Sequence, residues 1–180
     1  MRGLMLINNN VEDVEALATK ALLIRSGLLV ETFTLEADLN IVTKYQSRVE
    51  VDYLISELSL EAYDFLILPG GPHVFNFLGK SPELNELINY FNKQNKLIAA
   101  ICAAPLFLNE VNLLTNQPFT AFPGVVGKID GQYLENKKVV KINNIITSRS
   151  AGTVYEFVFE ILDTLMGSDA VNYLKKDIVF

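Results

Sequence analysis

Short apolar runs alternate with helical patterns along most of the chain, and this alternation constrains the fold more than any other sequence feature. Each run has the length of a buried strand and ends in a loop. A repeated strand–helix order predicts an α/β fold with a mostly parallel central sheet and helices on both faces. The four clearest runs are LMLI (4–7), LLVETFTL (28–35), FLIL within DFLILPGG (64–71) and KLIAAIC (96–102).

Helices are expected between and after these runs. The segment 11–26 has apolar residues at helical spacing, acidic residues in its first turn, and Gly27 where a C-terminal cap belongs. A second helix, over 81–91, is predicted to begin with Ser81 as its N-cap and Pro82 at its first position. The remaining expectations are helices at 104–114 and 150–167, a hairpin or edge strand within 36–60, and strands at 119–122 and 131–148.

The composition predicts one globular domain, residues 1–180, with no internal repeat and no low-complexity linker. Half of the 180 residues are hydrophobic, and the formal net charge is −6. Such a charge argues against a nucleic-acid partner, which calls for a basic face. No run of about 18 apolar residues is present, and the first apolar stretch is too short for a signal peptide. We therefore expect no membrane partner.

Cysteine and histidine each occur once, as Cys102 and His73. A single cysteine forms no internal disulfide, which is typical of a reducing, cytoplasmic location. One Cys and one His are too few for a tetrahedral zinc site of the usual kind within one chain. The sequence therefore predicts a cytoplasmic protein with no metal and no other cofactor.

Three features follow strands that a parallel sheet would bring to the same edge. An acidic loop (12–15) follows the first run, Gly70 and Gly71 follow the third, and Cys102 ends the fourth. Ligands of open α/β sheets bind beyond the carboxyl ends of the strands. We therefore expect these three features to form one site, in which the N–H groups of Gly70 and Gly71 form an oxyanion hole or an anion cradle.

Cys102 stands where a strand passes abruptly into a helix. Small neighbours on both sides, such as Ala99 and Ala103, allow a tight turn, as glycines do around the serine of a nucleophile elbow. The positive end of the following helix would lower the pKa of the thiol and favour the reactive thiolate. Alternatively, Cys102 is a small buried hydrophobe, as free cysteines often are.

The acidic loop tests whether these expectations are consistent. Glu15 falls beside Val14, near the apolar face of its helix, and is the acid most expected to point inward. A carboxylate beside a thiolate would repel it, so one of the two groups must hold a proton, and Glu15 is expected to have a raised pKa. Glu12 and Asp13 are expected only to stabilise the start of the helix.

These features, in this order, resemble the ThiJ/PfpI superfamily, and most closely its DJ-one-like branch. VEDVEAL resembles the acidic first loop of that family, DFLILPGG its strand and double glycine, and LIAAICAAP its elbow around a reactive cysteine. IITSRSAGTVYEF (145–157) resembles its late strand, arginine turn and final helix, which places Arg149 near the pocket. The resemblance implies a flavodoxin-like three-layer sandwich, of the class I glutamine amidotransferase type, and a homodimer with Arg25, Ser47 and Arg48 at or near its interface.

Two departures from the family pattern reduce the number of activities that the resemblance allows. Ala103 follows the cysteine where PfpI-type members have histidine, and Phe122 stands where many DJ-one-like members have histidine. The Cys–His pair of peptide or amide hydrolysis therefore has no obvious second member, which disfavours a cysteine peptidase or amidohydrolase. His73 either borders the pocket and moves a proton, or it is a surface or helix-start residue.

The resemblance implies glyoxalase or deglycase chemistry on a small reactive aldehyde, without glutathione. Cys102 would add to a 2-oxoaldehyde, Glu15 would move protons, and the N–H groups of Gly70, Gly71 and Ala103 would stabilise the oxyanion. The alternative is a noncatalytic redox sensor or chaperone, in which an oxidant attacks Cys102. A role in thiamine-precursor metabolism is disfavoured, because no residue indicates recognition of a thiazole and fold does not determine substrate.

Overall fold

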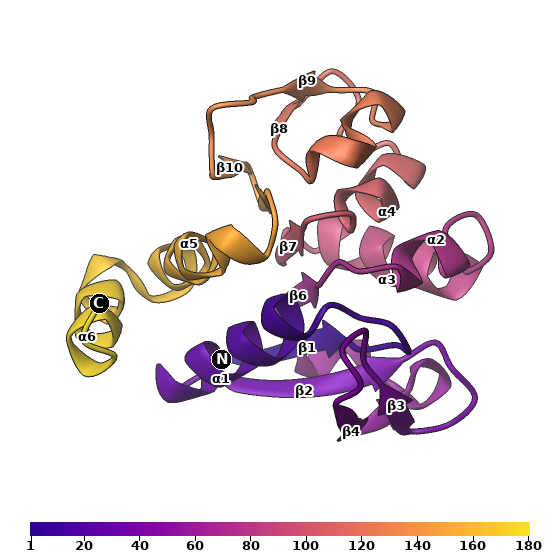
Figure 1. The fold of residues 1–180 in the computed structure, drawn as a ribbon, viewed down its shortest axis with the longest axis horizontal. Helices are drawn as coiled ribbons and strands as arrows, with labels where there is room; N and C mark the ends of the chain where they lie inside the picture. Colours follow the sequence, from indigo (N-terminus) through magenta and orange to yellow (C-terminus); the bar gives the residue numbers. More distant parts are fainter.

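The computed structural model describes residues 1–180 and contains a seven-stranded sheet in the order β10-β11-β7-β6-β1-β2-β5 (Figure 1). All neighbouring strands are parallel except β10 and β11, which form an antiparallel pair. The predicted mostly parallel sheet is therefore confirmed. The strands are β1 (Arg2–Leu6), β2 (Leu29–Thr34), β5 (Tyr53–Leu54), β6 (Phe65–Leu68), β7 (Leu97–Ile101), β10 (Val139–Ile142) and β11 (Ile145–Ser148).

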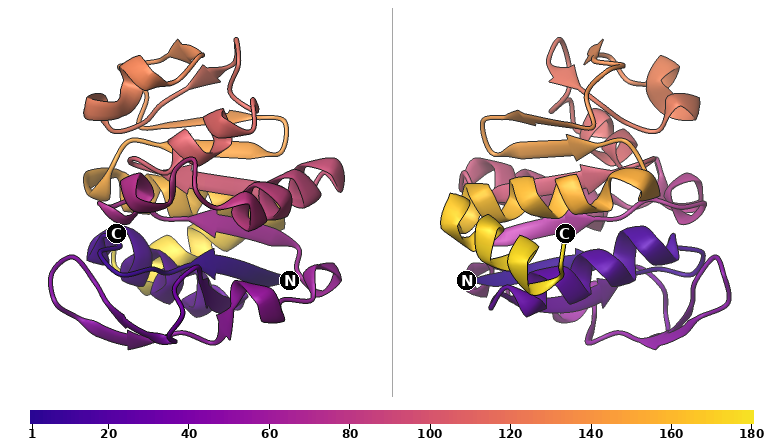
Figure 2. Two further views of the ribbon diagram at one scale, coloured as in Figure 1. Left: turned by 90° about the vertical axis from the view of Figure 1, so that its right-hand side faces the viewer. Right: turned by 60° about the vertical axis from the view of Figure 1, so that its left-hand side comes forward.

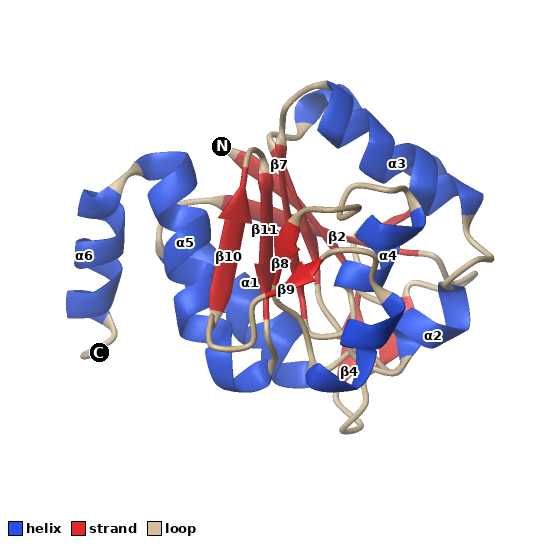
Figure 3. Ribbon diagram, turned by 90° about the horizontal axis from the view of Figure 1, so that it is seen from above, coloured by secondary structure: helices blue, strands red, loops and turns tan.

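Helices cover both faces of the sheet and complete a three-layer sandwich (Figure 3). Side chains of a strand alternate between the two faces, so successive residues of β1 enter different cores. Leu4 and Leu6 pack into the core beneath α3 and α4, whereas Met5 packs into the core beneath α1 and α5. The helices are α1 (Thr19–Arg25), α2 (His73–Phe77), α3 (Pro82–Lys93), α4 (Pro105–Glu110), α5 (Val154–Met166) and α6 (Ser168–Asp177). No helix has the length and apolar character needed to cross a membrane.

Two small two-stranded sheets lie beyond opposite edges of the central sheet (Figure 2). An antiparallel hairpin, β3 (Asn40–Val42) and β4 (Arg48–Glu50), lies on the side of β2. A parallel pair, β8 (Pro118–Phe119) and β9 (Gln132–Tyr133), lies on the side of β10. The segment 36–60 thus holds both structures that its sequence left open, the hairpin and the edge strand β5.

Several predicted helix boundaries need correction. The helix expected over 11–26 begins as a π-helical stretch, Val14–Ala18, before α1. The helix expected over 104–114 ends at Glu110, and α6 was not predicted. Gly27 follows α1 with a φ of +88°, as a C-terminal cap requires. Ser81 precedes α3, but its hydroxyl donates to the Phe77 carbonyl, at 3.2 Å, and does not cap the helix.

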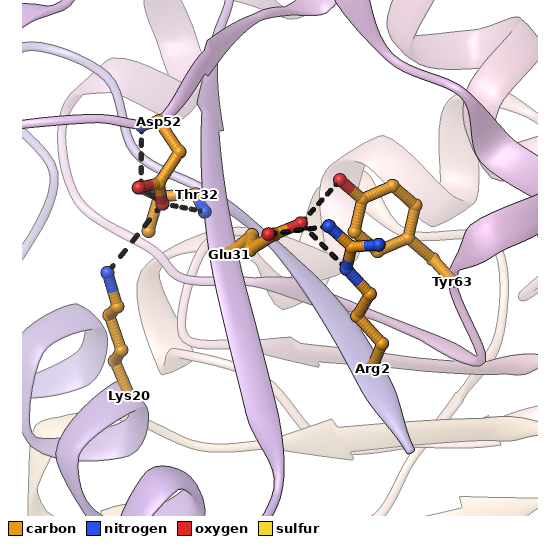
Figure 4. Close-up of polar contacts among 6 residues, drawn as sticks. All are labelled: Arg2, Lys20, Glu31, Thr32, Asp52 and Tyr63. Carbon is orange, nitrogen blue, oxygen red and sulfur yellow. Dashed lines mark hydrogen bonds and ion pairs between the residues drawn. The ribbon is translucent and has the colours of Figure 1, made fainter.

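Polar contacts secure the outer part of the sheet around β2 (Figure 4). The guanidinium of Arg2 donates two hydrogen bonds to Glu31, whose carboxylate also accepts one from the Tyr63 hydroxyl. On the neighbouring residue, the N–H and hydroxyl of Thr32 both donate to Asp52. These contacts connect β1, β2 and the segments that precede β5 and β6. They hold the edge of the sheet beside the hairpin.

Candidate active site

A cavity of about 330 Å³ lies beyond the carboxyl ends of the central strands and contains the side chain of Cys102. Twelve residues line it, and half of them are hydrophobic. They come from the segments after β1, β6, β7, β8 and β11, and from the turn of the β3–β4 hairpin. A larger hollow around Asn95 and Asn144 includes none of the residues that the sequence predicts for the site. The predicted convergence of the acidic loop, the double glycine and the cysteine is therefore present in the structure.

Cys102 occupies a strained turn directly after β7. Its φ is +66°, in the left-handed region that non-glycine residues rarely adopt. Its N–H donates to the Ser148 carbonyl at 3.0 Å, and its carbonyl accepts from the N–H of Phe122 at 2.9 Å. These bonds to two other segments hold the strained conformation. The backbone therefore has the geometry of a nucleophile elbow, as the sequence predicts.

The surroundings of Cys102 do not lower the pKa of its thiol, although the sequence predicts this effect from the following helix. The helix that follows, α4, has only six residues, and a turn separates it from Cys102. Burial of the thiol, together with the charge of Glu15, raises the pKa of Cys102 to about 12. The expectation of a thiol pKa lowered by a helix N-terminus is therefore wrong, because desolvation and a neighbouring anion outweigh the helix.

Glu15 lies in the π-helical stretch before α1 and is completely buried. The N–H of Gly70 donates to its Oε2 at 3.0 Å, and the Ser150 hydroxyl donates to its Oε1 at 3.4 Å. Burial raises the pKa of Glu15 to about 7, and a hydrogen bond with Cys102 partly opposes this rise. The inward position and the raised pKa agree with the prediction. The π-helical turn that positions the carboxylate was not predicted, because its residues have the apolar spacing of an ordinary helix.

Glu15 and Cys102 share protons as a pair. The charge of Glu15 and its hydrogen bond with the thiol raise the pKa of Cys102, and the same hydrogen bond lowers the pKa of Glu15. Ser150 lies against both, since its hydroxyl also approaches the Cys102 Sγ at 3.8 Å. The first proton therefore leaves the pair near neutral pH, and the second leaves only in strongly alkaline solution. Between these two pH values the pair holds one proton that can move between sulfur and oxygen.

The two glycines have different surroundings. The N–H of Gly70 is occupied by Glu15, so the expectation that it belongs to an oxyanion hole is wrong. Gly71 has a φ of +116°, lines the cavity, and its N–H makes no hydrogen bond within the chain. The N–H of Ala103 lies against the Cys102 sulfur. Gly71 and Ala103 are therefore the two backbone donors that the cavity offers to an oxyanion.

His73 is not at the surface and does not line the cavity. It is completely buried at the first position of α2. Its Nε2 donates to the Pro69 carbonyl at 3.1 Å, and its Nδ1 accepts from the Asn8 amide at 3.3 Å. The Asn8 side-chain oxygen accepts from the N–H of Leu35, which leaves the amide nitrogen as the donor to His73. Burial lowers the pKa of His73 to about 4, so the ring is neutral and supports the loop that carries the double glycine.

The other two acids of the first loop differ in role. Glu12 accepts the N–H of Glu15 at 2.8 Å, which stabilises the start of the helix as expected. Asp13 instead accepts the Thr43 hydroxyl at 2.6 Å and the N–H of Tyr45 at 3.0 Å. The expectation that Asp13 only stabilises a helix start is therefore wrong. It fixes the turn of the β3–β4 hairpin against the cavity.

Six cavity residues were missed from the sequence, and Arg149, which was expected near the pocket, does not line it. The six are Lys44, Tyr45, Pro72, Phe75, Ser150 and Ala151. The N–H of Arg149 donates to the Lys138 carbonyl, so the turn after β11 presents the next residue to Glu15 instead. A hydroxyl residue directly after the arginine turn was the available signal for Ser150. The hairpin residues reach the cavity only through the tertiary fold.

Phe122, which the family resemblance places at a possible pocket position, lines the cavity. No group of three or more His, Cys, Asp or Glu side chains is close enough to hold a metal ion. Arg25 forms an ion pair with Asp177 of the same chain, and Arg48 is exposed on β4. The homodimer and its interface residues stay a prediction.

Comparison with known proteins identifies the family. The model of the DJ-1/PfpI family matches residues 1–164. Protein dj-1beta of Drosophila melanogaster is 28% identical over 98% of this chain and 96% of its own, and its crystal structure superposes with a TM-score of 0.92 over 99% and 97% of the two chains. A protein of Caenorhabditis elegans named glutathione-independent glyoxalase DJR-1.2 is 27% identical over 96% of this chain and 92% of its own. A solved structure of oxidized Toxoplasma gondii DJ-1 is 25% identical, with a TM-score of 0.91 over 99% and 98% of the chains. The chain therefore belongs to the DJ-1/PfpI family.

Proposed function

We propose that the protein converts 2-oxoaldehydes to 2-hydroxy acids through the Cys102 thiol, as a glyoxalase that uses neither glutathione nor metal. The observation that carries this proposal is the pairing of a strained elbow cysteine with a buried glutamate whose pKa lies near neutrality. General acid–base catalysis is most effective when the pKa of the catalytic group is close to the operating pH. Glu15 meets this condition beside the only nucleophilic thiol of the chain.

The first step is addition of the thiol to the aldehyde. The Cys102 sulfur forms a bond to the aldehyde carbon, and its proton passes to the Glu15 carboxylate. The aldehyde oxygen takes up the electron pair of the carbonyl bond, next to the N–H groups of Gly71 and Ala103, and then receives the proton from Glu15. This gives a hemithioacetal and restores the Glu15 carboxylate. The high thiol pKa does not prevent this step, because Glu15 removes the proton as the sulfur attacks.

The second stage moves a proton between neighbouring carbons. Glu15 removes the hydrogen from the carbon bonded to sulfur, the electron pair forms a carbon–carbon double bond, and the ketone oxygen takes up the carbonyl pair to give an enediolate. The hydroxyl proton of the former aldehyde oxygen passes to the former ketone oxygen. The Glu15 carboxyl group then returns its proton to the former ketone carbon as the carbonyl forms beside sulfur, which gives a thioester of a 2-hydroxy acid. Water then cleaves the thioester and restores the Cys102 thiol. In the net reaction, one 2-oxoaldehyde and one water molecule give one 2-hydroxy acid, and no external oxidant or reductant is needed.

Consumption of methylglyoxal with detection of lactate tests this proposal, in buffer free of glutathione and metal ions. We expect turnover by the wild type, its loss in Cys102→Ser, and its loss in Glu15→Gln. Glu83→Gln, the same change at an exposed position on α3, is the matched control and should retain full activity. Lactate formation that persists in Cys102→Ser would contradict the proposal, as would an inert wild type with a correctly folded and alkylatable cysteine.

Redox sensing is the second candidate, and it is favoured because Cys102 is not fully buried and lines the cavity. Peroxide would transfer one oxygen to Cys102 and give a sulfenic acid and water, and a second equivalent would give the sulfinic acid. The chain has no second cysteine to form a disulfide with the intermediate. Mass spectrometry of the intact protein after peroxide treatment would show addition of two oxygen atoms at Cys102. A protein that resists peroxide but turns over methylglyoxal would exclude this candidate.

A further inference from the structure

Three half-exposed or exposed aromatic side chains line the cavity around Cys102. Tyr45, Phe75 and Phe122 have 63%, 47% and 45% of their surface exposed, although large aromatic side chains are normally buried. They come from the hairpin turn, from α2 and from the segment after β8. Aromatic side chains from three separate segments thus meet at one cavity, which contains the nucleophile.

The size and charge of the cavity also restrict what fills it. Its volume of about 330 Å³ corresponds to about ten water molecules. A 2-oxoaldehyde with a single methyl substituent would fill only a small part of this space and would leave the aromatic side chains in water. The charged groups at the wall are Glu12, Glu15 and Lys44, and the Lys44 Nζ lies 4.9 Å from the centroid of the Tyr45 ring. Half of the lining residues are hydrophobic, so the wall favours an apolar substituent.

We propose that the substrates are 2-oxoaldehydes whose ketone carries an aromatic group, such as phenylglyoxal. This inference rests on the proposed function, since it specifies the substrate class of the same site. The aldehyde carbon would lie at Cys102 and its oxygen at the N–H groups of Gly71 and Ala103. The aromatic group would then occupy the remaining volume between Phe75 and Phe122, where offset or edge contacts between rings are favourable. The reaction gives mandelate from phenylglyoxal and one water, by the steps derived above.

The ratio of kcat/KM for phenylglyoxal to that for methylglyoxal tests the inference. We expect the ratio to fall about tenfold in the double variant Phe75→Leu, Phe122→Leu, since loss of apolar contacts in a pocket has effects of this size. Comparing ratios between proteins removes the difference in intrinsic reactivity of the two aldehydes. Tyr173→Leu removes an equally exposed aromatic side chain on α6, away from the cavity, and should leave the ratio unchanged. An unchanged ratio in the double variant would overturn the inference.

A binding measurement separates this inference from the proposed function. Acetophenone carries the aromatic group but no aldehyde, and it should slow alkylation of Cys102 by iodoacetamide, whereas acetone should not. Protection by acetophenone without turnover of either aldehyde would overturn the glyoxalase proposal and support an aromatic ligand. Turnover without protection, and with equal ratios in all variants, would support the glyoxalase and overturn the aromatic substrate. If a second copy of the chain covered the three aromatic side chains, acetophenone would not protect Cys102 and the ratios would be equal in all variants. That result would also overturn the aromatic substrate.

Discussion

The N–H of Gly70 donates to Oε2 of Glu15 at 3.0 Å, and this hydrogen bond connects the loop after β6 to the acid beside Cys102. The contact is possible because Gly70 has no side chain. A Cβ at this position would lie 2.6 Å from the Cys102 Cβ and 2.7 Å from Glu15 Oε2. The glycine therefore allows the thiol and the carboxyl group to approach each other across the backbone.

Gly70→Ala is expected to separate the catalytic pair. The new methyl group overlaps both Cys102 and Glu15, so the backbone or Glu15 must shift and the hydrogen bond lengthens. Overpacking of this kind costs about 1–3 kcal/mol in the free energy of unfolding. We expect methylglyoxal turnover to fall at least about tenfold, because small misplacements of a catalytic group have large effects. Gly127→Ala is the control, since a Cβ there meets no atom within 4 Å, and equal losses in the two variants would refute this explanation.

Glu15→Gln is expected to lower the pKa of Cys102 while turnover is lost. The carboxylate charge is a cause of the raised thiol pKa, and glutamine removes that charge but can still accept from Gly70. Removal of a neighbouring like charge shifts a pKa by about 1–3 units. The rate of iodoacetamide alkylation, followed against pH, should therefore have its midpoint at lower pH in the variant. A midpoint that rises instead would show that a protonated Glu15 stabilises the thiolate in the wild type.

Much of the fold could be predicted from local sequence. The buried strands are continuous apolar runs, so β1, β6 and β7 were placed to within a few residues. Their parallel order also brings the cysteine and the acidic loop to one edge of the sheet. The last helix, α6, was missed because it follows Gly167 without a strong apolar run of its own.

The predictions about the site that proved wrong concern properties set by tertiary contacts. The thiol pKa could not be predicted from a helix start, because burial and Glu15 dominate it. Gly70 and Gly71 look alike in sequence, and only the approach of Glu15 makes the first of them unavailable to a substrate. The buried His73 is hydrogen-bonded to Asn8, which lies 65 residues earlier in the chain. Such pairings carry no local pattern.

Relief of strain at the elbow is expected when Cys102 is replaced by glycine. Alanine and glycine both remove the thiol, but only glycine adopts a φ of +66° without a steric cost. The left-handed conformation costs a residue with a Cβ about 1 kcal/mol or more. Cys102→Gly should therefore be more stable than Cys102→Ala by about 1 kcal/mol in urea unfolding. The opposite order would mean that packing of the Cβ against Gly70 outweighs the backbone strain.

The stability of the protein is expected to fall between pH 6.5 and pH 4 because of His73. Its folded pKa of about 4 lies below the ordinary value of 6.5, so the unfolded chain binds a proton in this window and the folded chain does not. Stability therefore rises with pH across the window, by about 3 kcal/mol if the full shift is expressed. His73 is the only histidine, so no other side chain has its ordinary pKa near 6.5.

Glu15 opposes this trend and must be removed to measure it. Its folded pKa, about 7, lies above the ordinary 4.5, so the folded chain binds the extra proton and stability falls as pH rises between these values. In a Glu15→Gln background, urea unfolding should show a steeper gain in stability from pH 4 to pH 6.5 than in the wild type. Adding His73→Leu should flatten this slope, although the Asn8 amide left without its acceptor lowers stability at every pH by about 1–3 kcal/mol. A slope that persists in the double variant would assign the acid sensitivity to groups other than the buried imidazole.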